Sequence, residues 1–307
     1  MILRTSIQNA EEIWTTALAN NDTRVPFATR PWHELWFKTL GTEWEPYLLS
    51  VDDTIVAPFA RKNNEMIFSG GMEISDYLDI IGPNEKKQEA WQQILEYSKN
   101  DGITSFHFHN IPQSSPTVAF FQKLPNTAIT REDTTPIIRF TGTWEEHIQS
   151  LQYKERHELR RKLRKIEKEH HGPTIISSAD PAHDITILLE LMQKDEQKQA
   201  FLTQDMTKFF QKIAEVFAHD ISLLILYMNG QPAAATFSFT ADHTYFLYNS
   251  GFNRECCPNA GFYLKAMSIK YALENGFKEY NFLQGDERYK YDLGGKDFFV
   301  YSISLAL

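Results

Sequence analysis

The chain has 307 residues, of which 42% are hydrophobic and 23% are charged, with no low-complexity tract and no apolar run long enough to span a bilayer. This length predicts two domains with separate cores, and the formal net charge of -9 argues against general nucleic-acid binding. The first residues lack the apolar segment of a secretory signal, so a cytoplasmic location is expected. The adjacent Cys256 and Cys257 fit no ordinary disulfide geometry.

The first half of the chain carries two helical patterns, at 10–20 and 31–40, and then a hairpin that turns at Asp52-Asp53 between apolar strands. A strand is expected next, at 66–69 or at 77–81. A helix at 86–99, ending near Gly102, and a strand at 104–109 complete this half.

The second half opens with a charged helix from Lys154 to Lys168, after which helical periodicity recurs at 186–199 and 206–219. The apolar stretch 221–228, the turn Asn229-Gly230 and the stretch 232–240 predict a hairpin, and 244–250 predicts a third strand. Asn259 is the predicted cap of a helix that ends at Gly276, with a strand at 278–283 behind it. The predicted buried face of that helix consists of Phe262, Ala266, Ile269 and Leu273.

Both halves therefore show the order helix, helix, three strands, helix, strand, although no residue-level repeat is visible. We infer a structural duplication of one α/β unit with mixed sheets. The predicted domains are 1–141 and 142–307, divided just before the charged helix.

Four segments support a resemblance to a known family. They are Pro26-Phe27 with Trp32, Ser75-Asp76-Tyr77, the basic run 154–168, and the stretch from Gly251-Phe252 through Gly285-Asp286 to Tyr289-Lys290. In this order they resemble the BioF2-like or CelD-like tandem-GNAT acetyltransferases, which are related to the FemAB peptidyltransferases. The resemblance implies two GNAT-like lobes, each a mixed, mostly antiparallel sheet flanked by helices. It also implies that the second lobe binds acyl-CoA or acetyl-CoA and that the first helps to form an acceptor cleft.

The helix start Asn259-Ala260-Gly261-Phe262 is the first candidate donor site, because free amides and the helix dipole favour a pyrophosphate. In a GNAT fold, the strand carrying Tyr248 and Asn249 would splay from the strand 278–283 and pair with a pantetheine arm. GNAT enzymes usually carry a glycine-rich phosphate loop, whereas only Gly261 follows Arg254 here. The alternative is an ordinary helix with one small residue for close packing.

The segment 284–290 follows a predicted strand, where ligand sites of α/β units gather. Acyl transfer to an amine needs a base, stabilisation of the carbonyl oxygen and an acid for the leaving thiolate. Asp286 or Glu287 is the candidate base, Lys290 the electrostatic stabiliser and Tyr289 the acid. The alternative is a solvated loop in which Tyr289 packs on the sheet.

Arg156, Arg160 and Arg164 recur at a four-residue spacing, which aligns them along one side of the charged helix. They are predicted to hold an anionic acceptor or a donor phosphate, and the alternative is a solvated face neutralised by neighbouring Glu residues. A tRNA contact is also open, although the chain lacks the long helical arm of Fem relatives that use aminoacyl-tRNA.

Asp76, Tyr77 and Asp79 are the candidate acceptor-binding residues of the first lobe, while Trp32 is expected in the core. His107 and His109 should share one face of a strand, as a metal pair would require. Because no further ligands can be identified and GNAT chemistry needs no metal, a structural role is expected for them.

The leading hypothesis is an acyl-CoA-dependent N-acyltransferase in which an amine attacks the acyl donor directly, with an amino sugar or a cell-envelope or polysaccharide precursor as acceptor. One alternative is a Fem-type aminoacyl or peptidyl transferase that uses aminoacyl-tRNA. Another is an inactive GNAT-like scaffold of a polysaccharide pathway. No metal cofactor is expected.

Overall fold

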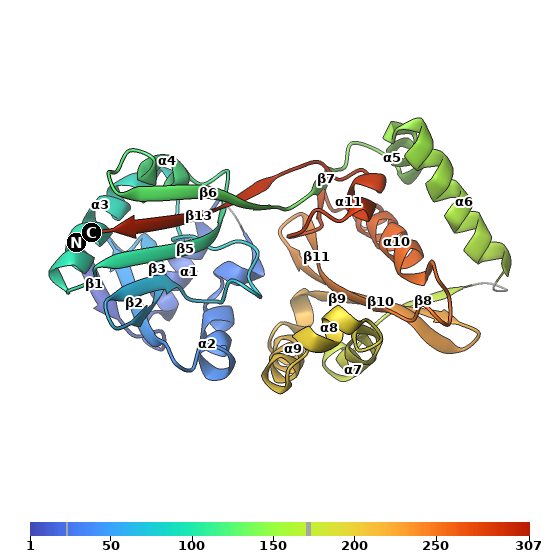
Figure 1. Cartoon of the computed structure of the whole chain (residues 1–307), viewed down its shortest axis with the longest axis horizontal. Coiled ribbons are helices and arrows are strands. Elements are labelled where there is room, and N and C mark those ends of the chain that lie inside the picture. Colours follow the sequence, from blue (N-terminus) through green and yellow to red (C-terminus); the bar gives the residue numbers. More distant parts are fainter. Residues whose placement is uncertain (23, 170–172) are drawn as a thin grey trace. The chain divides into compact units, whose positions relative to one another are not determined.

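The structure is a computed structural model that describes residues 1–22, 24–169 and 173–307. The chain folds into two compact units (Figure 1). Unit 1 consists of Met1–Thr134 and Phe298–Leu307, and unit 2 consists of Thr135–Asp297. Within the described part of the chain, none of the helices is long and apolar enough to cross a membrane.

Unit 1 is built on a seven-stranded sheet with the order β1-β2-β3-β4-β5-β13-β6. Its strands are β1 Ile2–Thr5, β2 Glu45–Val51, β3 Ile55–Lys62, β4 Glu65–Phe68, β5 Ser105–Pro112, β6 Thr127–Thr134 and β13 Phe299–Ala306. Its helices are α1 Glu11–Ala19, η1 Pro26–Ala28, α2 Arg30–Thr39, α3 Asn84–Asn100 and α4 Pro116–Phe121. The core contains a cluster of aromatic side chains in which the Phe68 and Phe108 rings lie 4.3 Å apart.

Unit 2 is built on a six-stranded sheet with the order β7-β12-β11-β10-β9-β8. Its strands are β7 Ile137–Arg139, β8 Thr174–Ser177, β9 Ile221–Met228, β10 Gln231–Ala241, β11 Thr244–Phe252 and β12 Glu279–Asn281. Its helices are α5 Trp144–Ser150, α6 Tyr153–Glu169, α7 Pro181–Met192, α8 Glu196–Phe201, α9 Gln204–Val216, η2 Ala218–Asp220, α10 Ala260–Glu274 and α11 Arg288–Asp292. Helices α5, α6 and α10 cover one face of the sheet, and α7 and α9 cover the other (Figure 1).

The predicted duplication is confirmed by the sheet pairings. In unit 1, β2, β3 and β4 form an antiparallel meander, and β5 then lies parallel to β4 after the crossover helix α3. In unit 2, β9, β10 and β11 form the same meander, and β12 lies parallel to β11 after α10. The predicted α/β class with mixed, mostly antiparallel sheets is therefore confirmed.

Most local predictions agree with the structure because turn chemistry determines them. Asp52, Asp53 and Asn229 have positive φ angles in the two hairpin turns, and Gly276 has φ +85° just after α10. The strand expected at 66–69 is β4, whereas 77–81 contributes only an isolated bridge between Ile81 and Val56.

Three predictions around the helices of unit 2 are wrong at least in part. The helix expected at 186–199 ends at Met192, because Asp195 caps a separate short helix, α8. Asn259 occupies the N-cap position of α10 as predicted, but its side chain makes no capping hydrogen bond. The buried face of α10 is also broader than predicted and includes Lys265 and Ser268, whereas Phe262 and Leu273 are only partly buried.

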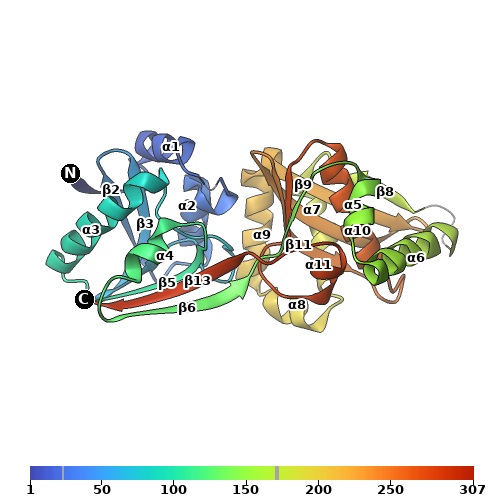
Figure 2. The same cartoon turned by 90° about the horizontal axis from the view of Figure 1, so that it is seen from above.

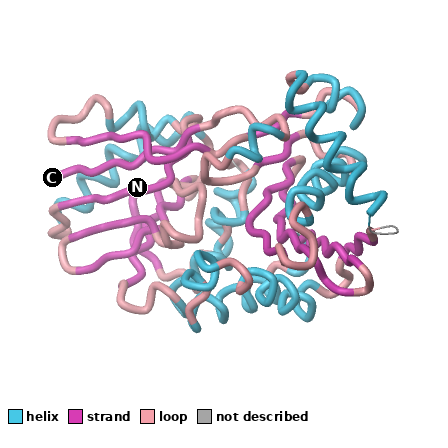
Figure 3. Tube along the Cα trace, turned by 45° about the vertical axis from the view of Figure 1, so that its right-hand side comes forward, coloured by secondary structure: helices cyan, strands magenta, loops and turns pink. Residues whose placement is uncertain are grey.

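The compact units have other bounds than the predicted domains 1–141 and 142–307, because β7 lies in unit 2 and the C-terminal segment from Phe298 joins unit 1. Strand β7 follows unit 1 in sequence but pairs with β12 of unit 2. Strand β13 follows unit 2 but lies between β5 and β6 of unit 1 (Figures 2 and 3). Each strand takes the same place in its sheet, antiparallel to the strand that follows the crossover helix. The unit 1 sheet is therefore completed by a strand from beyond its contiguous segment, whereas β7 lies within Thr135–Asp297, the contiguous segment of unit 2.

Candidate functional site

A pocket lies in unit 2 where the parallel strands β11 and β12 separate. They are paired only from Thr244–Glu279 to Phe246–Asn281, after which β12 ends and β11 continues to Phe252. A cavity of about 270 Å³ occupies this region, and we call it the splay pocket. It is lined by Lys198, Phe201, Leu247, Tyr248, Asn249, Ser250, Phe282, Gln284, Glu287, Tyr289 and Lys290.

A β-bulge shapes the β11 side of the splay pocket. Asn249 pairs with Phe237 and Leu247 pairs with Ser238, so Tyr248 is the extra residue between them. The Tyr248 ring packs 5.8 Å from the Phe210 ring of α9. The predicted donor residues Tyr248 and Asn249 therefore both lie at the pocket.

Lys198 of α8 was not predicted as a site residue but lines the same pocket. Its Nζ donates a hydrogen bond of 3.0 Å to Asn249 Oδ1 and another to the Ser250 carbonyl oxygen. Burial lowers the pKa of Lys198, and the negative charge of Asp195 opposes that effect. Lys198 thus places a cation at the bulge.

Lys290 lies on α11 and is 2% exposed. Its Nζ donates to the carbonyl oxygens of Leu283, Gln284 and Gly285 at 3.1, 2.5 and 3.0 Å, and lies 2.9 Å from Glu287 Oε2. Leu283 and Gly285 have φ angles of +57° and +111°, and leucine rarely adopts such an angle. The ammonium of Lys290 therefore stabilises a strained loop, and its N–H groups are already engaged.

The other predicted catalytic residues differ in position. Glu287 and Tyr289 line the splay pocket, whereas Asp286 is exposed and is not part of the lining. Burial opposes ionisation of Glu287, but the Lys290 charge and hydrogen bond bring the pKa of Glu287 below its ordinary value. Burial, aided by the Glu287 charge, raises the pKa of Tyr289. These shifts make Glu287 a weak base and Tyr289 a weak acid.

Lys265 of α10 lies beside the splay pocket, in the described part of unit 2, without a hydrogen-bond partner. It is 8% exposed, and its Nζ lies 4.2 Å from the ring centroid of Tyr289 and 5.9 Å from that of Phe252. Burial and the nearby Lys198 charge lower the pKa of Lys265 to about 7. The chain therefore keeps an amine beside the pocket that changes charge near neutral pH.

The buried amine of Lys265 should make the free energy of unfolding depend on pH. Because the pKa of Lys265 is about 7 in the folded chain and ordinarily 10.5, the unfolded chain binds more protons between these values, and stability rises with pH across this window. We expect Lys265→Met to be more stable than the wild type below pH 7, by several kcal/mol at about 1.4 kcal/mol per pKa unit. Chemical denaturation from pH 6 to 10 should show this difference shrinking. A difference independent of pH would contradict the prediction.

The predicted phosphate site at the start of α10 does not line the splay pocket. Residues 260–262 form the first turn of α10, directly after Asn259. A Cβ atom at Gly261 would lie 2.8 Å from the Phe252 ring, so this glycine permits close packing of the helix on β11. The packing explanation for Gly261 therefore has direct structural support, and phosphate binding by Asn259, Ala260, Gly261 and Phe262 stays a prediction.

The arginines of α6 have partners within unit 2. Arg156 Nη1 donates to the Gln149 carbonyl oxygen at 2.9 Å, Arg160 forms an ion pair with Glu145, and Arg164 Nε donates to the Arg160 carbonyl oxygen at 3.1 Å. The apolar side of α6, with Leu159, Leu163 and Ile166, is buried in the unit 2 core as predicted. The anion-binding role of the arginines stays a prediction.

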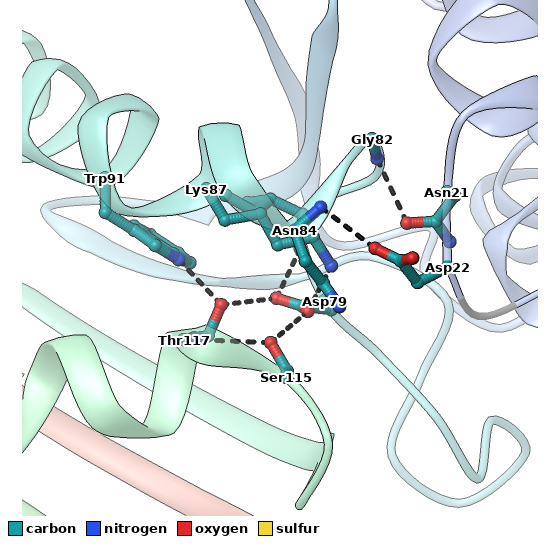
Figure 4. A network of polar contacts seen from close by, with 10 residues as sticks. Asn21, Asp22, Asp79, Gly82, Asn84, Lys87, Trp91, Ser115 and Thr117 are labelled. Atoms are coloured by element: carbon teal, nitrogen blue, oxygen red, sulfur yellow. Dashed lines mark hydrogen bonds and ion pairs between the residues drawn. The ribbon is translucent and has the colours of Figure 1, made fainter.

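In unit 1, Asp79 belongs to a network of polar contacts (Figure 4). Asp79 Oδ2 accepts hydrogen bonds from Lys87 Nζ at 2.7 Å and Ser115 Oγ at 2.5 Å, and Oδ1 accepts from Thr117 Oγ1 at 2.7 Å. Thr117 Oγ1 in turn accepts from Trp91 Nε1 at 2.8 Å. The Asp79 carboxylate thus connects the strand-to-helix loop to α3 and α4.

The other first-lobe candidates lie near this network. Tyr77 and Asp79 line a small cavity of about 20 Å³, which has room for about one water molecule. Tyr77 is buried with its ring edge-on to Phe298, and Asp76 is half-buried. Trp32 is fully buried and donates to Ser75 Oγ at 2.7 Å, which confirms its core position. Acceptor binding by Asp76, Tyr77 and Asp79 stays a prediction.

His107 and His109 share one face of β5 as predicted. Their Nδ1 atoms lie 3.2 Å from Ser304 Oγ and 2.5 Å from Glu132 Oε1. Among residues 1–22, 24–169 and 173–307, the structure contains no group of three or more His, Cys, Asp and Glu side chains suited to a metal ion.

Comparisons with known proteins agree with this architecture. Residues 153–291 match the family described as acetyltransferase (GNAT) domain. A conserved protein of unknown function from Bacteroides thetaiotaomicron VPI-5482 is 12% identical, with a TM-score of 0.68 and full coverage of both chains. FemX is 13% identical, with a TM-score of 0.67 over 100% of this chain and 97% of its own. A tandem GNAT protein from the clavulanic acid biosynthesis pathway is 10% identical, with a TM-score of 0.53 over 99% and 97%.

No curated protein matches the chain at the sequence level. The two duplicated units and the splayed parallel strands define a tandem acyltransferase fold. Residues 153–291 match the GNAT family model, and the whole chain shares the fold of FemX and of the tandem GNAT protein. The predicted resemblance is therefore confirmed for the GNAT family and the tandem fold.

Proposed function

We propose that the chain is an acyl-CoA-dependent N-acyltransferase of the cytoplasm. An amine, on an amino sugar or a cell-envelope precursor, would attack the acyl carbonyl directly. The observation that carries the proposal is the splay pocket, which opens between β11 and β12 of the domain matched to the GNAT family. The β11 backbone beyond Phe246 has no partner in β12 and is available to pair with a pantetheine arm.

In this proposal the residues of the splay pocket have distinct roles. Tyr248 and Asn249 bind the donor arm, and Tyr289 donates a proton toward the leaving sulfur. Lys290 acts through the loop 283–285, whose carbonyl oxygens it binds, and so positions the pocket wall. Most of the rate enhancement would come from holding the amine and the acyl carbon in contact distance.

Binding of the donor gives the direct test. At a hundred times its dissociation constant, a ligand stabilises the folded chain by about 2.7 kcal/mol. We expect CoA, acetyl-CoA and longer acyl-CoAs to raise the melting temperature, whereas adenosine diphosphate at the same concentration, which has no pantetheine arm, should have little effect. If millimolar CoA did not change the melting temperature, the proposal would be wrong.

A Fem-type aminoacyl transferase is the second candidate, and the likeness to FemX over the whole chain favours it. Binding of aminoacyl-tRNA together with no response to CoA would support it. An inactive scaffold would bind neither donor.

A further inference from the structure

Three lysines are buried in the described residues, and two of them have charged partners. Lys87 lies 2.7 Å from Asp79, and Lys290 lies 2.9 Å from Glu287. Lys265 has neither an ion pair nor a hydrogen bond in the part of the chain that the structure describes, and its amine faces the rings of Tyr289 and Phe252. The side chain is buried to 8% exposure, and ionisable groups that lack a charged partner in such surroundings gather at functional sites.

The charges around Lys265 come from several elements. Lys198 on α8, Lys290 on α11 and Glu287 just before α11 act on its amine, so two cations oppose one carboxylate. The contacts from β11 and α11 are aromatic and provide no further negative charge. Burial beside other cations favours the neutral amine, which is the form of lysine that accepts protons.

The other ionisable groups at the splay pocket are less suited to accept a proton. Glu287 is paired with Lys290, and the amine of Lys198 donates to two oxygens of β11. Asp286 is exposed, and its carboxylate is stabilised in the charged form by water. Lys265 is outside the lining as well, but it is buried behind the Tyr289 ring and its amine has neither a hydrogen bond nor an ion pair among the described residues.

We propose that Lys265 is the proton acceptor for the amine that attacks the acyl donor in the splay pocket. This role rests on the proposed acyltransferase function. The neutral Lys265 amine takes a proton from the acceptor ammonium, and the freed amine forms a C–N bond to the acyl carbon. The C–S bond breaks with its electron pair on sulfur, which takes a proton from the Tyr289 hydroxyl, and the new amide nitrogen gives its extra proton to the Tyr289 oxygen. The Lys265 ammonium releases its proton to solvent, so both side chains are regenerated.

The test combines rates with a direct titration. Acetyl-CoA and glucosamine are the probes, and kcat/KM is measured from pH 5.5 to 9 for the wild type, Lys265→Met and Lys265→Arg. Lys270→Met is the matched control, because Lys270 lies on the same helix and is paired with Glu274 at the surface. The Cε resonance of Lys265 in lysine-labelled protein, assigned by its loss in Lys265→Met, reports the charge of the amine without any need for turnover.

We expect the Lys265 resonance to titrate near pH 7 and kcat/KM to fall below the same pH. General-base catalysis contributes about 100-fold to 10,000-fold, so both Lys265 variants should lose at least about 100-fold in kcat, with KM for acetyl-CoA nearly unchanged. Lys270→Met should behave as the wild type. Titration of Lys265 at its ordinary value, or a Lys265→Met variant that keeps the rate and its acid limb, overturns the proposal.

If the proposed acyltransferase function is wrong, the experiment gives a different result from the one that overturns only the role of Lys265. In that case the wild type releases no CoA from acetyl-CoA although Lys265 still titrates near pH 7, and both the acyltransferase activity and the catalytic role of Lys265 are overturned. Because removal of a buried charge should stabilise the fold, Lys265→Met is expected to stay folded, and circular dichroism verifies this.

Discussion

Replacing Lys290 by alanine should unfold the loop 283–285 and weaken unit 2 as a whole. The ammonium of Lys290 binds three carbonyl oxygens and Glu287 at a position that is 2% exposed. Without it these carbonyls lose their partner, and Leu283 loses the contact that stabilises its left-handed conformation. Each buried polar group left without its partner costs about 1–3 kcal/mol, and because three carbonyl oxygens lose theirs we expect the unfolding free energy of unit 2 to fall by at least about 3 kcal/mol.

The experiment is chemical denaturation of Lys290→Ala beside Lys270→Ala, in which a partly exposed lysine of the neighbouring helix α10 is removed. Lys270→Ala should change stability by less than about 0.5 kcal/mol. Turnover of Lys290→Ala should fall together with stability, because the wall of the splay pocket is lost. A Lys290→Ala chain with wild-type stability but no turnover would show instead that the ammonium acts on the substrate.

The second large effect is expected at Asp79 in unit 1. Its carboxylate accepts hydrogen bonds from Lys87, Ser115 and Thr117, and the Lys87 side chain is only 3% exposed (Figure 4). Asp79→Ala leaves the Lys87 ammonium buried without its counter-charge and removes the carboxylate that joins α3 to α4, so that of this network only the Trp91–Thr117 hydrogen bond still links the two helices. We expect the unfolding free energy of unit 1 to fall by about 3–5 kcal/mol.

A double substitution separates this structural role from a role in acceptor binding. Replacing both partners, as Asp79→Leu with Lys87→Met, removes both buried charges and should recover part of the lost stability. Denaturation curves of the single and double variants measure the recovery. If Asp79→Ala cost less than about 1 kcal/mol, the network would not be a determinant of stability, and the predicted acceptor role of Asp79 would gain weight.

Local chemistry made much of each unit predictable. The hairpin at Asn229-Gly230, the C-terminal stop at Gly276 and the periodicities of α9 and α10 involve residues that are neighbours in sequence. The sheet partners of β7 and β13 were not predicted, because the partners of an edge or inserted strand are set by distant segments. Nothing within Phe299–Ala306 indicates that it lies between β5 and β6.

The candidate site was also predictable only in part, because some of its residues come from segments that are distant in sequence. Tyr248, Asn249, Glu287, Tyr289 and Lys290 come together in the splay pocket, while Asp286 and the start of α10 lie outside its lining. Lys198 and Lys265 were missed because a lone lysine on an amphipathic helix usually lies at the surface. A signal was present, since Lys265 is four residues from both Gly261 and Ile269 on the face of α10 that packs on the sheet.

The place of β13 between β5 and β6 has a consequence for how the protein folds during synthesis on the ribosome. When Met1–Thr134 has left the ribosome, the strands β5 and β6 are present, but the strand that separates them in the finished sheet is translated only after all of unit 2. Unit 2 has its full set of strands first, since β7 is translated before the rest of its sheet. The nascent chain therefore exposes two unpaired strand edges during this interval, and such edges promote aggregation. The order of synthesis makes unit 2 the first to mature, although it is the second in sequence.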